Sequence, residues 1–147
     1  MDMEMVERDV EVVFRDGSGV AGTFFLEPAS PLNERGQSLL DLLNGPRRFL
    51  PLRTPSGEVL ILQKNAIVMV RSTGREIESS MPYARIIPVR MDLLSGVTLE
   101  GSVYQDLPLS YPRISDFLNF SLQFFCLAMQ DVDCFVNSEM VRSVSQG

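Results

Sequence analysis

Residues 10–22 read VEVVFRDGSGVAG, a pattern typical of a β-hairpin. Its first five residues are mostly β-branched or aromatic, the types that strands favour. Asp16-Gly17 is a strong hairpin-turn signal, because glycine readily supplies the positive φ that such turns require. Residues 20–27 are again rich in apolar residues and predict a returning strand. The chain is therefore expected to start its fold with two antiparallel strands.

A short helix is predicted after this hairpin, over residues 38–45, which read SLLDLLNG. Ser38 is suited to cap the helix, and Asp41 occupies the capping-box position three residues on. Asn44 or Gly45 is expected to end the helix in the left-handed conformation.

Three more strands complete the predicted unit. Residues 48–53 and 58–63 predict a second hairpin across the TPSG turn, and residues 66–71 predict a closing strand. The predicted order is β-β-α-β-β-β.

The second half of the chain repeats this pattern. Its helix is expected near residues 112–119, and all matched positions follow one order with two small gaps. The matched pairs are Gly17 and Gly96, Gly22 and Gly101, Asp41 and Asp116, Asn44 and Asn119, Phe49 and Phe124, and Val70 and Val144. Such order favours a tandem duplication over chance.

The fold class expected from these patterns is mainly β, with a minor α contribution. The first repeat spans residues 10–71, a linker spans 72–86, and the second repeat spans 87–147. A unit of about 60 residues is marginally stable alone, so we expect the repeats to pack as a pseudo-two-fold pair in one globular body.

The ends of each repeat resemble known sequence motifs. Val-x-Val-x-Phe-x-Asp-Gly over residues 10–17, followed by Gly22, resembles the first motif of Sm-like proteins, and residues 62–70 resemble their closing motif. The resemblance implies a strongly bent Sm-like or SH3-like barrel in each repeat. The chain departs from the family in carrying a helix inside the unit. The Gly…Asp-x-Leu-Asn…Phe pattern is also similar to that of a bacterial protein family.

The composition limits the chemistry that the chain can perform. Histidine is absent from all 147 residues, which removes the commonest general base and the commonest metal ligand. Two cysteines without histidine do not complete a four-ligand zinc site. No nucleophile with a neighbouring base is evident. We therefore expect no enzyme activity, no metal site and no cofactor.

The sequence favours a cytoplasmic protein. Residues 1–9 are acidic and lack the apolar core of a signal peptide, and no apolar run approaches the roughly 18 residues of a membrane span. Cys126 and Cys134 lie in apolar surroundings, which favours buried, reduced thiols over a disulfide.

Arg47, Arg48 and Arg53 form the one dense basic cluster of the sequence. Guanidinium groups can bind phosphate or carboxylate in a bidentate manner, so an anion site is sought here first. The simpler interpretation is a solvated strand face.

A second candidate motif recurs at the same spacing in both repeats: Asp41 with Asn44, and Asp116 with Asn119. Residues three apart on a helix share one face and can contact a ligand. The structural interpretation is that Asp favours the positive end of the helix dipole and Asn closes the last turn.

Aromatic residues and a glycine pattern are assigned structural roles. The phenylalanines in the predicted strands and helices, Phe49 and Phe120 among them, are expected in the core. Residues 17–22 match Gly-x-Gly-x-x-Gly, but a strand follows where a dinucleotide site needs a helix.

The function expected from the sequence is a non-enzymatic interaction or scaffold module. Its partner is another protein or a second copy in a homodimer. One alternative is an Sm-like binder of single-stranded nucleic acid that uses the arginine cluster, although a net charge of −6 opposes it. Another is a small-molecule or anion sensor with a site between the repeats. No membrane partner is expected.

Overall fold

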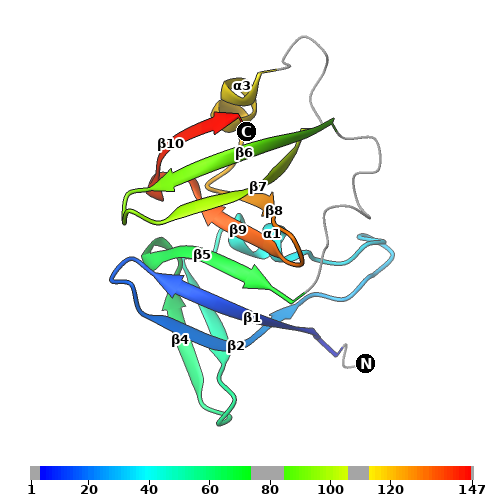
Figure 1. Cartoon of the computed structure of the whole chain (residues 1–147). Coiled ribbons are helices and arrows are strands. Elements are labelled where there is room, and N and C mark those ends of the chain that lie inside the picture. The colour runs from blue at the N-terminus through cyan, green and yellow to red at the C-terminus, as the bar shows by residue number, and fades with distance from the viewer. Residues whose placement is uncertain (1–3, 74–84, 106–112, 147) are drawn as a thin grey trace. The chain divides into compact units, whose positions relative to one another are not determined.

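The computed structural model describes residues 4–73, 85–105 and 113–146 (Figure 1). The chain divides into two compact units, Met1–Ser72 and Thr73–Gly147. The fold is mainly β, with antiparallel strands and two α-helices among the described residues. This agrees with the fold class expected from the sequence.

The described residues of the first unit, 4–72, form five strands, one α-helix and one 3-10 helix. Its strands lie in the order β5-β1-β2-β3-β4, so the last strand pairs with the first. The elements are β1 (Val6–Phe14), β2 (Gly19–Leu26), α1 (Leu39–Leu43), β3 (Phe49–Arg53), β4 (Val59–Gln63), η1 (Lys64–Ala66) and β5 (Ile67–Ser72).

In its described residues, the second unit has the same element order and the same strand lengths. Its strands lie in the order β10-β6-β7-β8-β9, and a 3-10 helix again precedes the last strand. The elements are β6 (Arg85–Leu93), β7 (Thr98–Gln105), α3 (Ile114–Phe120), β8 (Phe124–Ala128), β9 (Asp133–Asn137), η2 (Ser138–Met140) and β10 (Val141–Gln146).

Three hairpins turn through the same three-residue loop, which ends in a left-handed glycine. The φ angles of Gly17, Gly57 and Gly96 are 87°, 91° and 91°. In the first loop, Phe14 N–H donates to Ser18 O at 2.8 Å, and the other two loops have the equivalent bond. The Gly-x-Gly-x-x-Gly segment is thus a turn leading into strand β2.

Two other glycines, Gly22 and Gly101, lie where neighbouring strands approach closely. Strands β2 and β3 pair only at Thr23 and Arg53, and β7 and β8 pair only at Ser102 and Ala128. A Cβ atom on Gly22 would lie 2.6 Å from a backbone oxygen of β3. Any side chain at this position would therefore force the strands apart.

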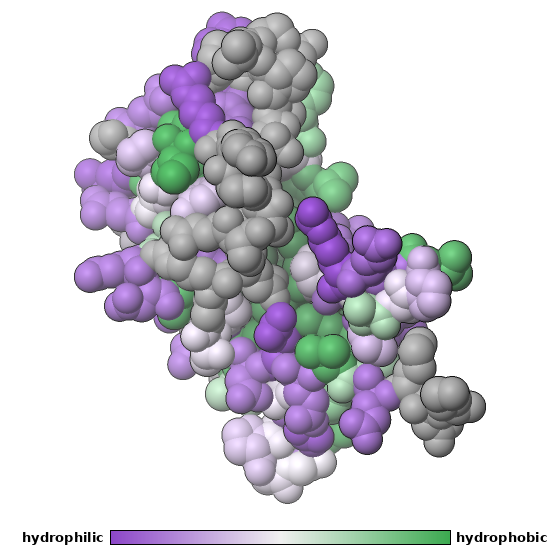
Figure 2. Space-filling model, turned by 90° about the vertical axis from the view of Figure 1, so that its right-hand side faces the viewer, coloured by the Kyte–Doolittle hydropathy of each residue, from purple (hydrophilic) through white to green (hydrophobic). Residues whose placement is uncertain are grey.

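Buried apolar residues come from the strands and from helix α1, whereas α3 has no fully buried residue. Helix α1 contributes Leu39 and Leu43, and the ring of Phe117 on α3 meets that of Phe125 on β8 edge-on, with centroids 6.2 Å apart. On the side drawn in Figure 2, the surface is largely hydrophilic, with smaller hydrophobic groups between. Two phenylalanines expected in the core are exposed instead: Phe49 by 49% and Phe120 by 62%.

The structure corrects several predicted boundaries. Strand β1 begins at Val6, ahead of residue 10. The predicted linker, residues 72–86, lies mostly outside the described residues, but Ser72 ends β5 and Arg85 begins β6.

The predicted left-handed end of the first helix is wrong. Asn44 has a φ of −97°, and Gly45 is not among the glycines with positive φ. The helix ends instead in a tighter turn, with Gly45 N–H donating to Leu42 O at 3.3 Å. Pro46 follows, and a proline disfavours helical conformation in the residue before it.

Candidate functional site

The Arg53 side chain contacts groups on two other strands. Its guanidinium donates to the carboxylate of Glu7 on β1 at 2.6 Å and lies 5.2 Å from the ring centroid of Phe25 on β2. Both charged side chains are about half exposed, so the ion pair adds at most about 1 kcal/mol to stability. Arg53 therefore serves to tie β1, β2 and β3 together.

Arg47 and Arg48 lie at the opposite end of strand β3. Both are exposed, and neither makes an ion pair within the described residues. Five residue steps of extended chain separate Arg48 from Arg53 by about 16 Å. The three guanidinium groups consequently do not form one anion-binding cluster.

The two repeated aspartates both lie in the first turn of a helix. Asp41 forms a complete capping box with Ser38, through two hydrogen bonds of 3.0 Å. Asp116 instead pairs with Arg113 at 3.2 Å, and α3 has no side-chain cap. Asn44 is the C-cap of α1, whereas Asn119 lies within α3.

Lys64 is a charged residue whose burial was not predicted. Only 8% of it is exposed, its Nζ donates to Gly45 O at 2.6 Å, and its backbone N–H donates to Arg48 O at 2.8 Å. Burial lowers the pKa of the Lys64 ammonium. Lys64 thereby holds both sides of the short loop that presents Arg47. No sequence pattern marks a lysine after an apolar strand as buried.

An exposed apolar surface lies on the hairpin β3–β4. Phe49 and Pro51 on β3, with Val59 and Ile61 on β4, point to the same side of the hairpin, and we call these four residues the β3–β4 strip. Phe49, Val59 and Ile61 are 49%, 52% and 64% exposed. Pro51 and Ile61 are direct cross-strand neighbours, so the four side chains are contiguous.

The equivalent hairpin of the second unit differs in exposure. Every residue of β8 and β9 is buried. Cys126 pairs with Phe135 and Leu127 with Cys134, so the two cysteines lie on opposite faces of the sheet. Neither cysteine forms a disulfide.

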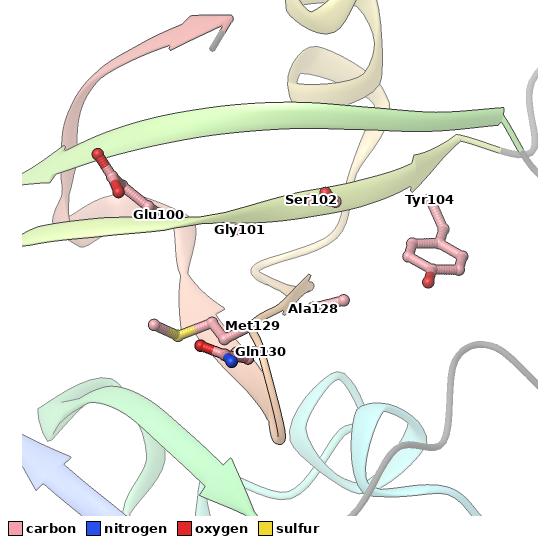
Figure 3. Close-up of a pocket in the computed structure, with 7 residues that line it drawn as sticks. All are labelled: Glu100, Gly101, Ser102, Tyr104, Ala128, Met129 and Gln130. Atoms are coloured by element: carbon pink, nitrogen blue, oxygen red, sulfur yellow. The ribbon is translucent and has the colours of Figure 1, made fainter.

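The second unit also contains an open pocket of about 430 Å³. Figure 3 shows its lining residues on strand β7 and on the end of β8 with the turn after it. The lining is mixed, with the carboxylate of Glu100 and the side chains of Ser102, Tyr104, Met129 and Gln130. Such a pocket can receive small polar groups, but it holds no pair of acid and base.

Neither a metal-binding cluster nor a long apolar helix occurs in the part of the chain that the structure describes. Within the described ranges, no three Cys, Asp or Glu residues are grouped closely enough to hold a metal ion. None of the helices found there has both the length and the apolar character that crossing a bilayer demands.

No family model, curated protein or solved structure matches this chain.

Proposed function

We propose that this chain is a non-enzymatic interaction module that binds another polypeptide through the β3–β4 strip. The observation that carries the proposal is the exposure of Phe49, Val59 and Ile61, which together with the half-buried Pro51 form one apolar surface beside an open strand edge. Exposed apolar groups of this kind mark interaction surfaces when they cluster rather than scatter.

The arrangement suits an extended partner segment. Strand β4 ends the strand order of its unit, and a peptide in extended conformation can add to such an edge through backbone hydrogen bonds. The neighbouring Phe49 and Ile61 side chains then provide apolar contacts that select the partner's side chains. No catalytic group is required for this role.

We also propose that each unit is a small, strongly bent barrel of the Sm-like or SH3-like kind, and that the two units arose by duplication. Both units place the last strand beside the first and a 3-10 helix before the last strand. Both pair their first two strands in the same register, with Val10 opposite Gly22 and Val89 opposite Gly101. These equivalences support the proposal.

A cytoplasmic location is part of the proposal. Cys126 and Cys134 are buried on neighbouring strands and are not joined by a disulfide, a state that suits a reducing compartment.

Single-stranded nucleic acid is a second candidate ligand, supported by the exposed pair Arg47 and Arg48. Fluorescence anisotropy with labelled single-stranded RNA at low and moderate salt would test it. Salt-sensitive binding that is lost in the Arg47→Ala, Arg48→Ala variant would favour this function. Absence of binding at low salt would exclude it.

The leading proposal is tested by capture of partners from cell extract on the immobilised full chain. We expect Phe49→Ser to reduce capture of a specific partner at least about tenfold, because it removes an exposed aromatic anchor. Ile86→Ser is the matched control, since Ile86 is 57% exposed and lies on β6 of the second unit, which contributes no residue to the strip. Equal capture by the wild type and both variants would contradict the proposal.

A further inference from the structure

The hydrogen-bonding pattern of hairpin β3–β4 determines which backbone groups of β4 face outward. Thr54 N–H donates to Glu58 O, and Lys64 N–H donates to Arg48 O, each at 2.8 Å. Antiparallel ladders alternate between hydrogen-bonded and non-hydrogen-bonded pairs. The even-numbered residues of β4 therefore bond to β3, and the odd-numbered residues direct their N–H and C=O groups outward.

Three residues, Val59, Ile61 and Gln63, thus present three donors and three acceptors along the outer edge. In the described part of the chain, no strand pairs with this edge. The five residues from Val59 to Gln63 include no charge and no proline, and their pairing with β3 has no bulge. Charges, prolines and bulges are the usual devices that keep an edge strand from pairing with another chain.

We infer that strand β4 pairs with β4 of a second copy of this chain, antiparallel and centred on Ile61, to form a two-fold symmetric dimer. This inference rests on the proposed function, because it names the partner of the same surface. In this register Ile61 faces Ile61 of the second copy, and Val59 faces Gln63 at each end.

The register centred on Ile61 satisfies every outward backbone group. The three facing pairs are all of the hydrogen-bonded type, and each exchanges two bonds. The six outward N–H groups of the two copies then meet six outward C=O groups. A shift by two residues leaves the outward groups of one residue in each copy unpaired, which makes that register weaker.

Side chains favour the same register. The facing residues from Val59 to Gln63 carry no charge, so the pairing brings no like charges together. Ile61 packs beside its own copy across the two-fold axis. An isologous contact needs a surface that is complementary to itself, and β4 fulfils this condition.

The dimer is expected to be weak. Pairing of two five-residue strands buries less than the roughly 1,200 Å² found at the small end of stable interfaces. Association should therefore be concentration-dependent and in the micromolar range or weaker.

Sedimentation velocity of the full chain over about two orders of magnitude in concentration measures this association. We expect a reversible monomer–dimer equilibrium in the wild type. Ile61→Lys places two positive charges face to face at the axis, and Ile61→Pro removes an outward N–H that makes no bond to β3. Each is expected to raise the dimer dissociation constant at least about tenfold. Ile86→Lys should leave it unchanged.

A mixing experiment tests the symmetric register itself. The I61K and I61E proteins should each be monomeric, and an equimolar mixture should associate, because Lys and Glu then face each other at the axis. Unfolding curves of all variants establish that loss of the dimer is not loss of the fold.

The outcomes separate this inference from the proposed function. A wild type that is monomeric at every concentration, yet captures a partner through Phe49, would overturn the dimer and leave the interaction module standing. A dimer that persists in I61K and I61P would place the contact elsewhere and also overturn the inference. A monomer whose partner capture is insensitive to Phe49→Ser would refute both proposals.

Discussion

Two glycines set the distance between strands at the points where β2 meets β3 and β7 meets β8. A Cβ on Gly22 would lie 2.6 Å from Arg53 O, and one on Gly101 would lie 2.6 Å from Ala128 O. Real Cβ atoms do not come this close to a carbonyl oxygen, and a backbone oxygen is not free to move aside. Absence of a side chain at these two positions is therefore a condition of the fold.

We expect Gly22→Ala and Gly101→Ala each to lower the free energy of unfolding by about 1–3 kcal/mol or more, because strands β2 and β7 must shift. Gly17→Ala is the comparison: its Cβ would meet nothing within 4 Å, so only its positive φ is penalised, by about 1–2 kcal/mol. Urea denaturation measures the three values. An unchanged midpoint for Gly22→Ala would show that the strands separate freely here.

Asp92 links three strands of the second unit. It accepts a hydrogen bond from Thr98 Oγ1 at 2.7 Å and lies 3.5 Å from the guanidinium of Arg142. The Thr98 hydrogen bond, followed by the positive charges of Arg90 and Arg142, lowers the pKa of Asp92 below its ordinary 3.8.

A lowered pKa in the folded state means that the unfolded chain binds the proton more tightly, so ionised Asp92 stabilises the fold. This contribution is present above pH 3.8 and is lost as the pH falls through the lower pKa of the folded state. We expect Asp92→Asn to be less stable than the wild type at neutral pH, with a difference that shrinks below pH 3.8. Urea unfolding of both proteins across this range measures it, and a pH-independent difference would argue against the charge.

The two short helices begin with different caps, although both carry aspartate at the third helical position. Ser38 caps α1 through its hydroxyl, whereas Arg113 precedes α3 and provides no side-chain cap. The ion pair of Arg113 with Asp116 compensates little, because the arginine is 78% exposed.

Arg113→Ser should give α3 the same kind of capping box that α1 has. A serine before α3 would have the same spacing to Asp116 as Ser38 has to Asp41. Its hydroxyl would accept a hydrogen bond from the backbone N–H of Asp116. We expect a gain of about 0.5–1 kcal/mol in the free energy of unfolding. Ser38→Ala should cause a loss of about 1 kcal/mol at the equivalent place. Thermal and urea unfolding measure both, and a loss of stability in Arg113→Ser would show that the ion pair outweighs the cap.

Most strands and the first helix were predictable from alternation, turn glycines and capping residues, and the second helix from its match to the first repeat. The start of β1 was not, because residues 6–9 read VERD and lack an apolar pattern; pairing of Val6 with Leu26 extends the strand instead. The exposed side of β3 and β4 could not be predicted for the opposite reason. Both strands are almost continuously apolar, so a period of two does not reveal which face meets water.

The candidate site was only partly predictable. The arginines were chosen for their proximity in sequence, but an extended strand carries Arg53 away from Arg48. The burial of Lys64 depends on Gly45 and Arg48, which lie far back in the chain, and no local signal encodes that contact.

At the level of the whole molecule, the described parts of the two units share an element order but differ in the surfaces they present. Hairpin β3–β4 exposes an apolar strip, whereas hairpin β8–β9 is buried throughout. The proposed binding surface therefore belongs to the first unit alone, and substitutions that abolish binding are expected to concentrate there.

The buried hairpin also determines the thiol chemistry of the chain. Cys126 and Cys134 are 6% and 0% exposed and lie on opposite faces. We expect neither to react with a thiol reagent in the native protein and both to react after denaturation. Mild oxidation of the native protein should yield no intramolecular disulfide, as judged by mass spectrometry, because the side chains point apart. Such a disulfide, if it formed, would refute the strand register.

The close approach at Gly22 and Gly101 has a consequence for how mutational tolerance in this chain is interpreted. Every possible replacement of glycine adds a Cβ, so no substitution at these positions is conservative. A survey of all single substitutions should record them as the most intolerant sites, at a level usually associated with catalysis. Here the intolerance to substitution would result from the short distance between two strand backbones. The positions that report on function would instead be the exposed residues of strand β4, where the fold accepts many side chains.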